Sequence, residues 1–384
     1  MRIAYITAYD PLDINNWSGL GFFIWKSLAA RGIEVELIGP LPLPLHLRKL
    51  TILKRRFHHL FGKFYWPDGD WANVRARSLL AGKRLRKIRP VDAVMSATVL
   101  PVAGLAGDVP LVVYADATLR ALFKTYPAHA NMAGGNYRDA DKIERHAQRR
   151  AAALVYSSEW AAESARNDYS VPPAKVHVVP FGANLEIPPS RASVEQAIAV
   201  RDRHAVRLLF MGVEWERKGG PAAVAVARRL NAMGIPAQLT VIGCEPQLDP
   251  ADQTFITLLG YVKKSGTGLT RIQAELSRSH FLLMPSKAEC FGIVYCEASA
   301  FGVPSIALNV GGVASAVRNG RNGRRFEPGD SPAQIAEWIA TTFRNFENYR
   351  QLALSSLSEF EEHLNWNVAG EKLEHILQSV IAKK

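Results

Sequence analysis

Two glutamates with an aromatic–glycine pair between them carry the clearest chemical signal in this sequence of 384 residues. Glu289 and Glu297 flank seven residues, among them Phe291-Gly292, and an apolar run at 281–284 precedes the segment. The run predicts a buried strand, which puts Glu289 on the loop after it and Glu297 inside the following helix. Free backbone N–H groups at the start of that helix can receive a phosphate.

Basic residues follow a second apolar run, at 208–211, which predicts another buried strand. Arg217 and Lys218 lie in the loop after it, and Gly219 begins the next helix. Ligands of open parallel sheets bind at the carboxyl ends of the strands, so we expect these cations and carboxylates to share one site. Asp116 has the same kind of position, after a strand at 111–114 in the first half of the chain.

The strands and helices that must position these residues form one pattern twice. In the first half, a βαβ unit is expected from strands at 3–7 and 33–38, a glycine turn at 17–21 and a helix at 22–30. Further strands are expected at 91–96, 111–114, 153–156 and 176–179. The second half repeats the pattern, with a helix at 219–233 and strands at 208–211, 238–242, 255–258, 281–284 and 305–308. We therefore predict two doubly wound α/β domains, joined near 184–205 by a linker with Pro188-Pro189-Ser190.

The segment 41–70 interrupts this rhythm because it is rich in proline and basic residues, and it is expected to carry a short helix or mobile loops. Between Arg48 and Arg89 the sequence has 13 Lys+Arg against two Asp. Residues 1–185 hold 25 basic and 15 acidic side chains, net +10, whereas residues 186–384 hold 22 and 20, net +2. This local excess predicts an anionic partner, such as an acidic membrane surface or a phosphate-bearing lipid-linked acceptor. Nucleic acid is not expected, because the excess is confined to one block and no nucleic-acid-binding module accompanies it.

The composition excludes several classes of protein. With 48% hydrophobic and 21% charged residues the chain can bury substantial cores, and its length exceeds that of a single core. Three cysteines, Cys244, Cys290 and Cys296, are too few and too poorly spaced for a disulfide framework or a zinc site. The N-terminus reaches Asp10 before a signal-peptide core forms, and no run of about 18 apolar residues follows. We expect a cytoplasmic protein that is peripheral on the inner face of the plasma membrane if the basic block binds lipid.

Several motifs together point to a known family. They are Glu289-x-Phe291-Gly292 with Glu297, Ala300-Phe301-Gly302-Val303-Pro304, and Gly311-Gly312. In this combination the sequence resembles the retaining glycosyltransferases of family 4, which have the GT-B architecture. The likeness reaches both halves of the chain, through the glycine turn at 17–21, Val179–Asn184, Arg217-Lys218-Gly219-Gly220 and Leu364-Asn365-Trp366.

The resemblance implies two Rossmann-like domains that face a central cleft. Residues 1–185, with a basic insertion at about 41–89, would bind the acceptor, and residues 186–364 would bind a nucleotide-sugar donor. A helix within 365–384 would cross back to the first domain. The implied reaction moves a hexose-type sugar from a nucleoside diphosphate, for example a UDP- or GDP-sugar, to a hydroxyl of a glycan or lipid-linked acceptor. It would retain the anomeric configuration and serve the synthesis of cell-surface polysaccharides or glycolipids.

The resemblance also implies roles for single residues. Glu289 would approach the donor sugar as a catalytic residue, while Lys218, with Arg217 as a second cation, would bind the phosphates. Glu297 would accept hydrogen bonds from the ribose hydroxyls. The other expected donor-binding residues are Gly19, Gly243, Phe291, Gly292 and Ile293. No metal ion or other cofactor is expected, because the sequence has no aspartate-rich metal motif and cations must neutralise the leaving diphosphate.

Two positions depart from the family pattern. Where the family usually carries an arginine after the first strand of the second domain, this chain has Val213, and Arg217 would be the substitute. Where the family has a His-Asp pair, this chain has Ala115-Asp116. Asp116 would then bind the acceptor or accept its proton, with His129 as a second candidate. The open alternatives are a nucleotide-sugar epimerase, a phosphorylase of the same architecture and a catalytically silent nucleotide-sugar-binding subunit.

Overall fold

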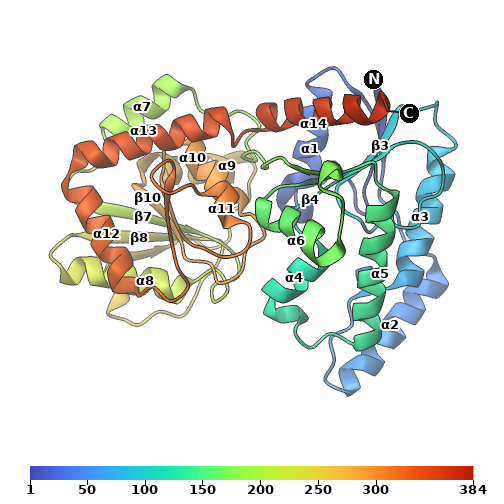
Figure 1. Cartoon of the computed structure of the whole chain (residues 1–384). Helices are drawn as coiled ribbons and strands as arrows, with labels where there is room; N and C mark the ends of the chain where they lie inside the picture. Colours follow the sequence, from blue (N-terminus) through green and yellow to red (C-terminus); the bar gives the residue numbers. More distant parts are fainter. Residues whose placement is uncertain (384) are drawn as a thin grey trace. The chain divides into compact units, whose positions relative to one another are not determined.

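Two parallel sheets of six strands each form the framework of the chain (Figure 1). The computed structural model describes residues 1–383, and each sheet belongs to one of two units. Unit 1 consists of Met1–Pro180 and the segment from Trp366 onward, and unit 2 consists of Phe181–Asn365. The two sheets, each covered by helices, confirm the predicted pair of doubly wound α/β folds.

The sheet of unit 1 has the strand order β2-β1-β3-β4-β5-β6, and all neighbouring strands are parallel. Its strands are β1 (Arg2–Ile6), β2 (Glu34–Ile38), β3 (Ala93–Ser96), β4 (Leu111–Ala115), β5 (Ala153–Tyr156) and β6 (Val176–Val178). β3, β4 and β5 are buried along their whole length, which is why they are short apolar runs without alternation.

The helices of unit 1 that pack on this sheet follow the expected spacing of apolar residues. α5 (Gly134–Arg150), for example, buries Ala140, Ile143 and Ala147, which lie three and four residues apart on one face. The others are α1 (Leu20–Ala29), α3 (Trp71–Leu85), α4 (Leu119–Thr125) and α6 (Glu159–Tyr169).

The basic segment differs from its predicted form. In place of a short helix or loops, residues 41–70 contain α2 (Leu45–Leu60), a helix of 16 residues. The prolines of the segment lie before Leu45 or after Leu60, so they do not interrupt the helix. The insertion also ends earlier than residue 89, because α3 buries Val74 and Ala81 in the core of unit 1 and forms part of the connection from β2 to β3.

The sheet of unit 2 has the order β12-β11-β10-β7-β8-β9 and is also parallel throughout. Its strands are β7 (Val206–Met211), β8 (Ala237–Ile242), β9 (Ile256–Leu258), β10 (Phe281–Met284), β11 (Ser305–Leu308) and β12 (Gly323–Phe326). The sequence reading missed β12, because Gly323-Arg324-Arg325 carries no apolar pattern. The helices are α7 (Arg191–Ala199), α8 (Gly220–Ala232), α9 (Gly266–Arg278), α10 (Ile293–Ala300), α11 (Val313–Ala316), α12 (Pro332–Arg344) and α13 (Phe346–Glu362).

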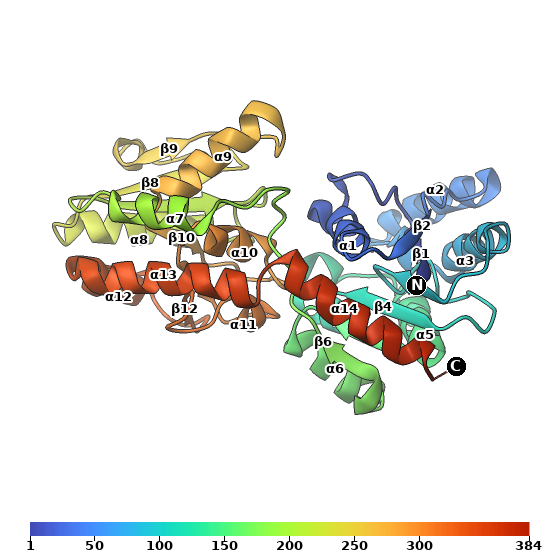
Figure 2. The ribbon, with the colours of Figure 1, turned by 90° about the horizontal axis from the view of Figure 1, so that it is seen from above.

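The last helix of the chain returns to unit 1, as predicted. α14 (Trp366–Ile381) packs on α1, where the Trp366 and Phe23 rings stack with centroids 6.3 Å apart (Figures 1 and 2). Arg31, just after α1, forms an ion pair with Glu374 of α14. The stacked rings and the neighbouring ion pair thus hold α14 against α1.

A buried carboxylate joins two helices of unit 1. Glu144 of α5 is 1% exposed and accepts hydrogen bonds from the Leu119 amide at the start of α4 and from the Gln148 side chain. Burial raises the pKa of Glu144 from 4.5 to about 7, and the two hydrogen bonds offset only part of the cost of removing its charge from water. Glu144 therefore holds its proton more tightly in the folded chain than in the unfolded chain.

Replacing Glu144 by Gln should change how stability depends on pH. The free energy of unfolding of the wild-type chain should fall by up to about 3 kcal/mol as the pH rises from 4.5 to 7, because the folded state loses a proton that it binds preferentially. Glu144→Gln has no such proton; its side-chain oxygen can accept from the Leu119 amide, and its NH2 can donate to the Gln148 side-chain oxygen once that amide group is turned over. Urea unfolding at a series of pH values measures the difference, and parallel curves for the two chains would contradict it.

Candidate functional site

The loops at the carboxyl edge of the unit 2 sheet contain most of the residues predicted to bind the donor. β11, β10, β7 and β8 are neighbours in this sheet and run in the same direction, so the loops that follow them lie along one edge. Lys218 follows β7, Gly243 follows β8, Glu289 follows β10 and Gly311 follows β11. Residues far apart in sequence therefore meet there.

Lys218 and Glu289 form an ion pair at this edge, although 71 residues separate them. The lysine and glutamate side chains are 15% and 10% exposed, so little water reaches either group. A glycine at position 212 makes room for the lysine, because a Cβ atom there would lie 3.0 Å from Lys218 Cγ. The structure confirms that these two residues lie close together, and their common binding role stays a prediction.

The main chain of Glu289 is fixed by the Gly311-Gly312 loop. The amide of Gly312 donates to the Glu289 carbonyl oxygen at 3.2 Å. A Cβ atom on Gly311 would lie 1.9 Å from the same oxygen, and Gly311 also has a left-handed φ of +52°. Only glycine combines that conformation with so close an approach, so a larger residue at position 311 would displace the Glu289 main chain.

Arg217 fastens the loop after β7 to the loop after β10. Its guanidinium donates to the Ala288 carbonyl oxygen at 2.8 Å and to both carboxylate oxygens of Glu214, and its own carbonyl accepts from the Lys287 amide. The hydrogen bonds from Arg217 lower the pKa of Glu214. These contacts support the segment that carries Glu289, and a role of Arg217 in phosphate binding stays a prediction. Val213, where the family has an arginine, is exposed and supplies no charge.

Glu297 forms a second buried pair, which the sequence reading missed. The side chain of Glu297 in α10 is 3% exposed, and both of its carboxylate oxygens accept from Lys264 Nζ, at 2.5 and 2.8 Å. Lys264 lies in the loop between β9 and α9. No motif in the sequence marks Lys264, and a lysine in a loop without a motif is most often a solvated charge.

Glycines shape the remaining predicted donor-binding positions. Gly292 has a φ of +91° and precedes Ile293, the first residue of α10, whose first-turn amides have no partner within the helix. Gly243 has a φ of +108°, and a Cβ atom there would lie 2.6 Å from the Gly212 carbonyl oxygen. Phe291 is buried, and its ring meets that of Phe181 edge-on with centroids 5.3 Å apart. Phe291 therefore has a packing role in unit 2.

In unit 1, Asp116 follows β4 and accepts a hydrogen bond from Trp17 Nε1 at 3.3 Å. Trp17, Ser18 and Gly19 all have left-handed φ values, 47°, 55° and 84°, in the 3₁₀ turn before α1. Such a conformation costs a tryptophan or serine roughly 1–3 kcal/mol and recurs at functional sites. Tyr9 adds to this corner, because burial, with the nearby charge of Asp116, raises the pKa of its hydroxyl. The turn and the position of Asp116 after a strand were expected from the sequence, but the contact between Trp17 and Asp116 was not.

Asp116 is not the cap of the helix that follows it. Thr118 has that role, since its side chain accepts from the Ala121 amide at the start of α4. His129, the second candidate, lies among the rings of Phe64, Trp66 and Phe123, with centroid distances of 5.0 to 6.0 Å. Burial lowers the pKa of His129, which favours the neutral imidazole.

Two family models match the chain. The model described as Glycosyltransferase Family 4 matches residues 24–187, and the model described as Glycosyl transferases group 1 matches residues 205–345. The first covers most of unit 1 and the second covers most of unit 2.

Known proteins of this kind are similar to the chain. D-inositol 3-phosphate glycosyltransferase 1 of Catenulispora acidiphila is 30% identical over 242 residues, which are 59% of this chain but only 57% of that protein. Alpha-maltose-1-phosphate synthase of Mycolicibacterium smegmatis is 24% identical over 301 residues, 73% of this chain and 77% of that protein.

A solved structure agrees with the fold. Sucrose-phosphate synthase of Thermosynechococcus elongatus is similar with a TM-score of 0.63 at 18% identity, and the comparison covers 100% of both chains. The architecture is therefore that of the GT-B proteins. With both of its units matched by the two models, the chain belongs to the group 1, family 4 glycosyltransferases.

Proposed function

We propose that the chain moves a hexose-type sugar from a nucleoside diphosphate sugar to a hydroxyl group of a glycan or lipid-linked acceptor, with retention of the anomeric configuration. The observation that carries this proposal is the pair of lysine–glutamate contacts at the carboxyl edge of the unit 2 sheet. This edge is where ligands of parallel α/β sheets bind, and the groups there suit a molecule that has both phosphates and hydroxyls. Membership of the glycosyltransferase family supports the same reaction.

Lys218 is proposed to bind the diphosphate. Its ammonium has three N–H donors, so it can keep its bond to Glu289 while it donates to phosphate oxygens. The amides in the first turn of α10, beginning at Ile293, add dipoles that favour negative charge. Together these groups can neutralise a departing nucleoside diphosphate, and we therefore propose that transfer needs no metal ion.

Glu297 is proposed to accept hydrogen bonds from the ribose hydroxyls of the donor. Its two carboxylate oxygens offer about four lone-pair sites, and Lys264 uses one direction at each oxygen. The lysine can therefore remain while the ribose binds, and it compensates the charge of a carboxylate that is almost out of water. A buried glutamate without a cation would be far more costly.

Glu289 is proposed to hold the hydroxyls of the donor sugar and to stabilise the positive charge that develops at the anomeric carbon. Its position is fixed from both sides, by Lys218 at the carboxylate and by Gly312 at the main chain. In the proposed step, the bond from the anomeric carbon to the diphosphate breaks and the acceptor oxygen bonds from the same face. The acceptor proton passes to the leaving phosphate oxygen, which keeps the configuration without a covalent enzyme intermediate.

The acceptor is proposed to bind to unit 1 through Asp116. A carboxylate that already accepts from an indole N–H can also accept from a sugar hydroxyl, and the Trp17 ring offers an apolar face to a sugar. The two relatives are named for D-inositol 3-phosphate and α-maltose 1-phosphate, which are both phosphate-bearing compounds rich in hydroxyl groups.

Binding of the donor can be tested with a thermal-shift panel of UDP, GDP and ADP, since a ligand at ~100 times its Kd adds about 2.7 kcal/mol of stability. For the nucleotide that binds best, Lys218→Ala should weaken binding by roughly 10- to 100-fold, because a hydrogen bond from a charged group to phosphate is lost. Lys263→Ala, an exposed lysine beside Lys264, is the matched control and should bind like the wild type. Equal Kd values for all three chains, measured by calorimetry, would remove Lys218 from the proposal.

Turnover should depend on Glu289. Glu289→Gln should lower kcat by roughly 100-fold, because the carboxylate no longer stabilises the developing charge, while nucleoside diphosphate binding is retained. The assay follows release of nucleoside diphosphate with and without acceptor, in the presence of EDTA, and NMR gives the anomeric configuration of the product. Release without acceptor, an inverted product or loss of activity in EDTA would each overturn part of the mechanism. A protein that binds the donor but transfers nothing would be a silent subunit.

The glycine loop behind Glu289 offers a test of positioning. Gly311→Ala should destabilise the chain and weaken turnover, because its Cβ would collide with the Glu289 carbonyl oxygen. Gly320→Ala is the matched control, since Gly320 also has a positive φ, +74°, but nothing lies within 4 Å of its Cβ. The control should cost about 1–2 kcal/mol for the left-handed conformation alone, and Gly311→Ala at least about 1 kcal/mol more. Urea unfolding and kcat measure both, and equal losses would show that the loop does not position Glu289.

A further inference from the structure

The insertion helix α2 exposes a large apolar surface. Of the 18 large hydrophobic side chains that are exposed in the described chain, eight fall within residues 45–64: Leu45, Leu50, Ile52, Leu53, Phe57, Leu60, Phe61 and Phe64. Leu53, Phe57 and Leu60 are 64%, 54% and 81% exposed and are spaced four and three residues apart, on one face of the helix. A cluster of this size on a surface marks an interaction site.

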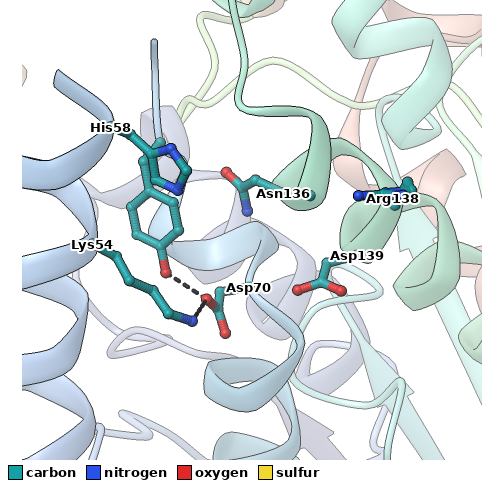
Figure 3. Close-up of a pocket in the computed structure, with 8 residues that line it drawn as sticks. Lys54, His58, Asp70, Asn136, Arg138 and Asp139 are labelled. Carbon is teal, nitrogen blue, oxygen red and sulfur yellow. Dashed lines mark hydrogen bonds and ion pairs between the residues drawn. The ribbon is translucent and has the colours of Figure 1, made fainter. Parts of the chain in front are cut away.

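The face of α2 that contacts the rest of unit 1 is mainly polar. Along the helix, the partly buried residues are Leu47, Thr51, Lys54 and His58, and their spacing of four, three and four residues makes them one stripe. Lys54 and Tyr65 both donate to Asp70, and the His58 ring stacks on Tyr65 with centroids 5.5 Å apart (Figure 3). Thr51 is hydrogen-bonded to Asn73 of α3.

These contacts fix the rotation of the helix. Burial alone would raise the pKa of Asp70, but its hydrogen bonds with Lys54 and Tyr65 outweigh burial and lower the pKa, so the carboxylate stays charged and holds both partners. The polar stripe is therefore held inward, and the leucines and phenylalanines are held outward. An amphipathic helix of a water-exposed surface would have the opposite orientation.

The charges on α2 identify the partner that the apolar face fits. The helix has five Lys+Arg, namely Arg48, Lys49, Lys54, Arg55 and Arg56, and no acidic residue. All of these except Lys54 are exposed, and Lys49 and Arg56 lie beside the apolar face, four residues before Leu53 and Leu60. A symmetric contact with a second copy of the chain would bring such unpaired positive charges together. A surface of acidic lipids instead attracts the cations and receives the apolar side chains.

We propose that α2 docks on an anionic membrane surface, with Leu53, Phe57 and Leu60 inserted at the level of the acyl chains and the flanking Lys and Arg side chains among the headgroups. No helix among residues 1–383 is long and apolar enough to span a membrane, so this contact is peripheral. The inference goes beyond the proposed transfer reaction and does not depend on it. The charge of residues 48–89 predicted only an anionic partner. The exposed apolar side chains of α2 add the insertion of this helix into the membrane surface.

Cosedimentation with vesicles tests the proposal on the full chain. The wild type should bind vesicles of phosphatidylglycerol and phosphatidylcholine, and bind less as salt rises. Leu53→Ser/Phe57→Ser/Leu60→Ser should lower the partition coefficient at least about tenfold, since three apolar side chains no longer insert. Leu79→Ser/Ile187→Ser/Val200→Ser replaces three exposed apolar residues elsewhere and should bind like the wild type.

A second pair of variants separates charge from insertion. Arg55→Glu/Arg56→Glu should lower binding to the anionic vesicles at least about tenfold, since each lost cation is worth roughly a fivefold factor and the new carboxylates are repelled. Arg229→Glu/Lys372→Glu makes the same change in net charge at other exposed positions and should have little effect. Nucleoside diphosphate binding should be unchanged in all variants, which keeps a failure here distinct from a failure of the transfer reaction.

Three results would overturn the proposal. The first is a wild type that stays in the supernatant with anionic vesicles, and the second is a triple serine variant of α2 that binds as well as the wild type. The third concerns the oligomeric state measured by light scattering. If the wild type is a dimer, and the triple serine variant is a monomer whose binding to vesicles is unchanged, then a second copy of the chain covers this face. Retained unfolding temperatures in circular dichroism exclude loss of folding as the cause of weaker binding.

Discussion

Burying two carboxylates at one edge of a sheet is costly, and much of unit 2 is arranged around that cost. Glu289 and Glu297 are almost inaccessible to water, and a buried carboxylate without a cation is penalised by several kcal/mol. Lys218 and Lys264 meet this requirement from two different loops. Two glycines serve this arrangement, since Gly212 leaves room for the Lys218 side chain and Gly311 lets the Glu289 carbonyl oxygen approach closely. In the proposed function, these charges are already in place before the donor binds.

Much of this arrangement could be predicted because it depends on rules that apply along the sequence. Short apolar runs such as 208–211 and 281–284, which are followed by loop residues, are typical of buried parallel strands. Residues after such strands lie along one edge of the sheet, which is why Lys218 and Glu289 were expected together. Lys264 was missed because no local pattern distinguishes it from other loop lysines, and its partner is set by how α10 packs. β12 was missed because Gly323-Arg324-Arg325 shows no apolar pattern before Phe326, and its pairing with β11 makes it a strand.

The basic insertion shows a different limit. Its charge was evident in the sequence, but leucine and isoleucine among lysines and arginines fit either a helix with its apolar side inward or one with its apolar side outward. Lys54, His58 and Thr51 decide between them, and each does so through a residue outside the helix, at Asp70, Tyr65 or Asn73. In the same way, the glycine turn before α1 was expected, but the left-handed Trp17 and Ser18 were not, because that conformation depends on contacts with residues distant in the sequence, such as Asp116.

The return of α14 to α1 has a consequence for the order in which the chain can be completed. A ribosome makes the strands of unit 1 first, then all of unit 2, and only then the helix whose Trp366 stacks on Phe23. Until that moment the apolar side of α1 lacks its cover, so the nascent amino-terminal half must wait in an unfinished state while its neighbour is synthesised. Translation speed and chaperone access during that interval are then part of what determines the yield of native protein.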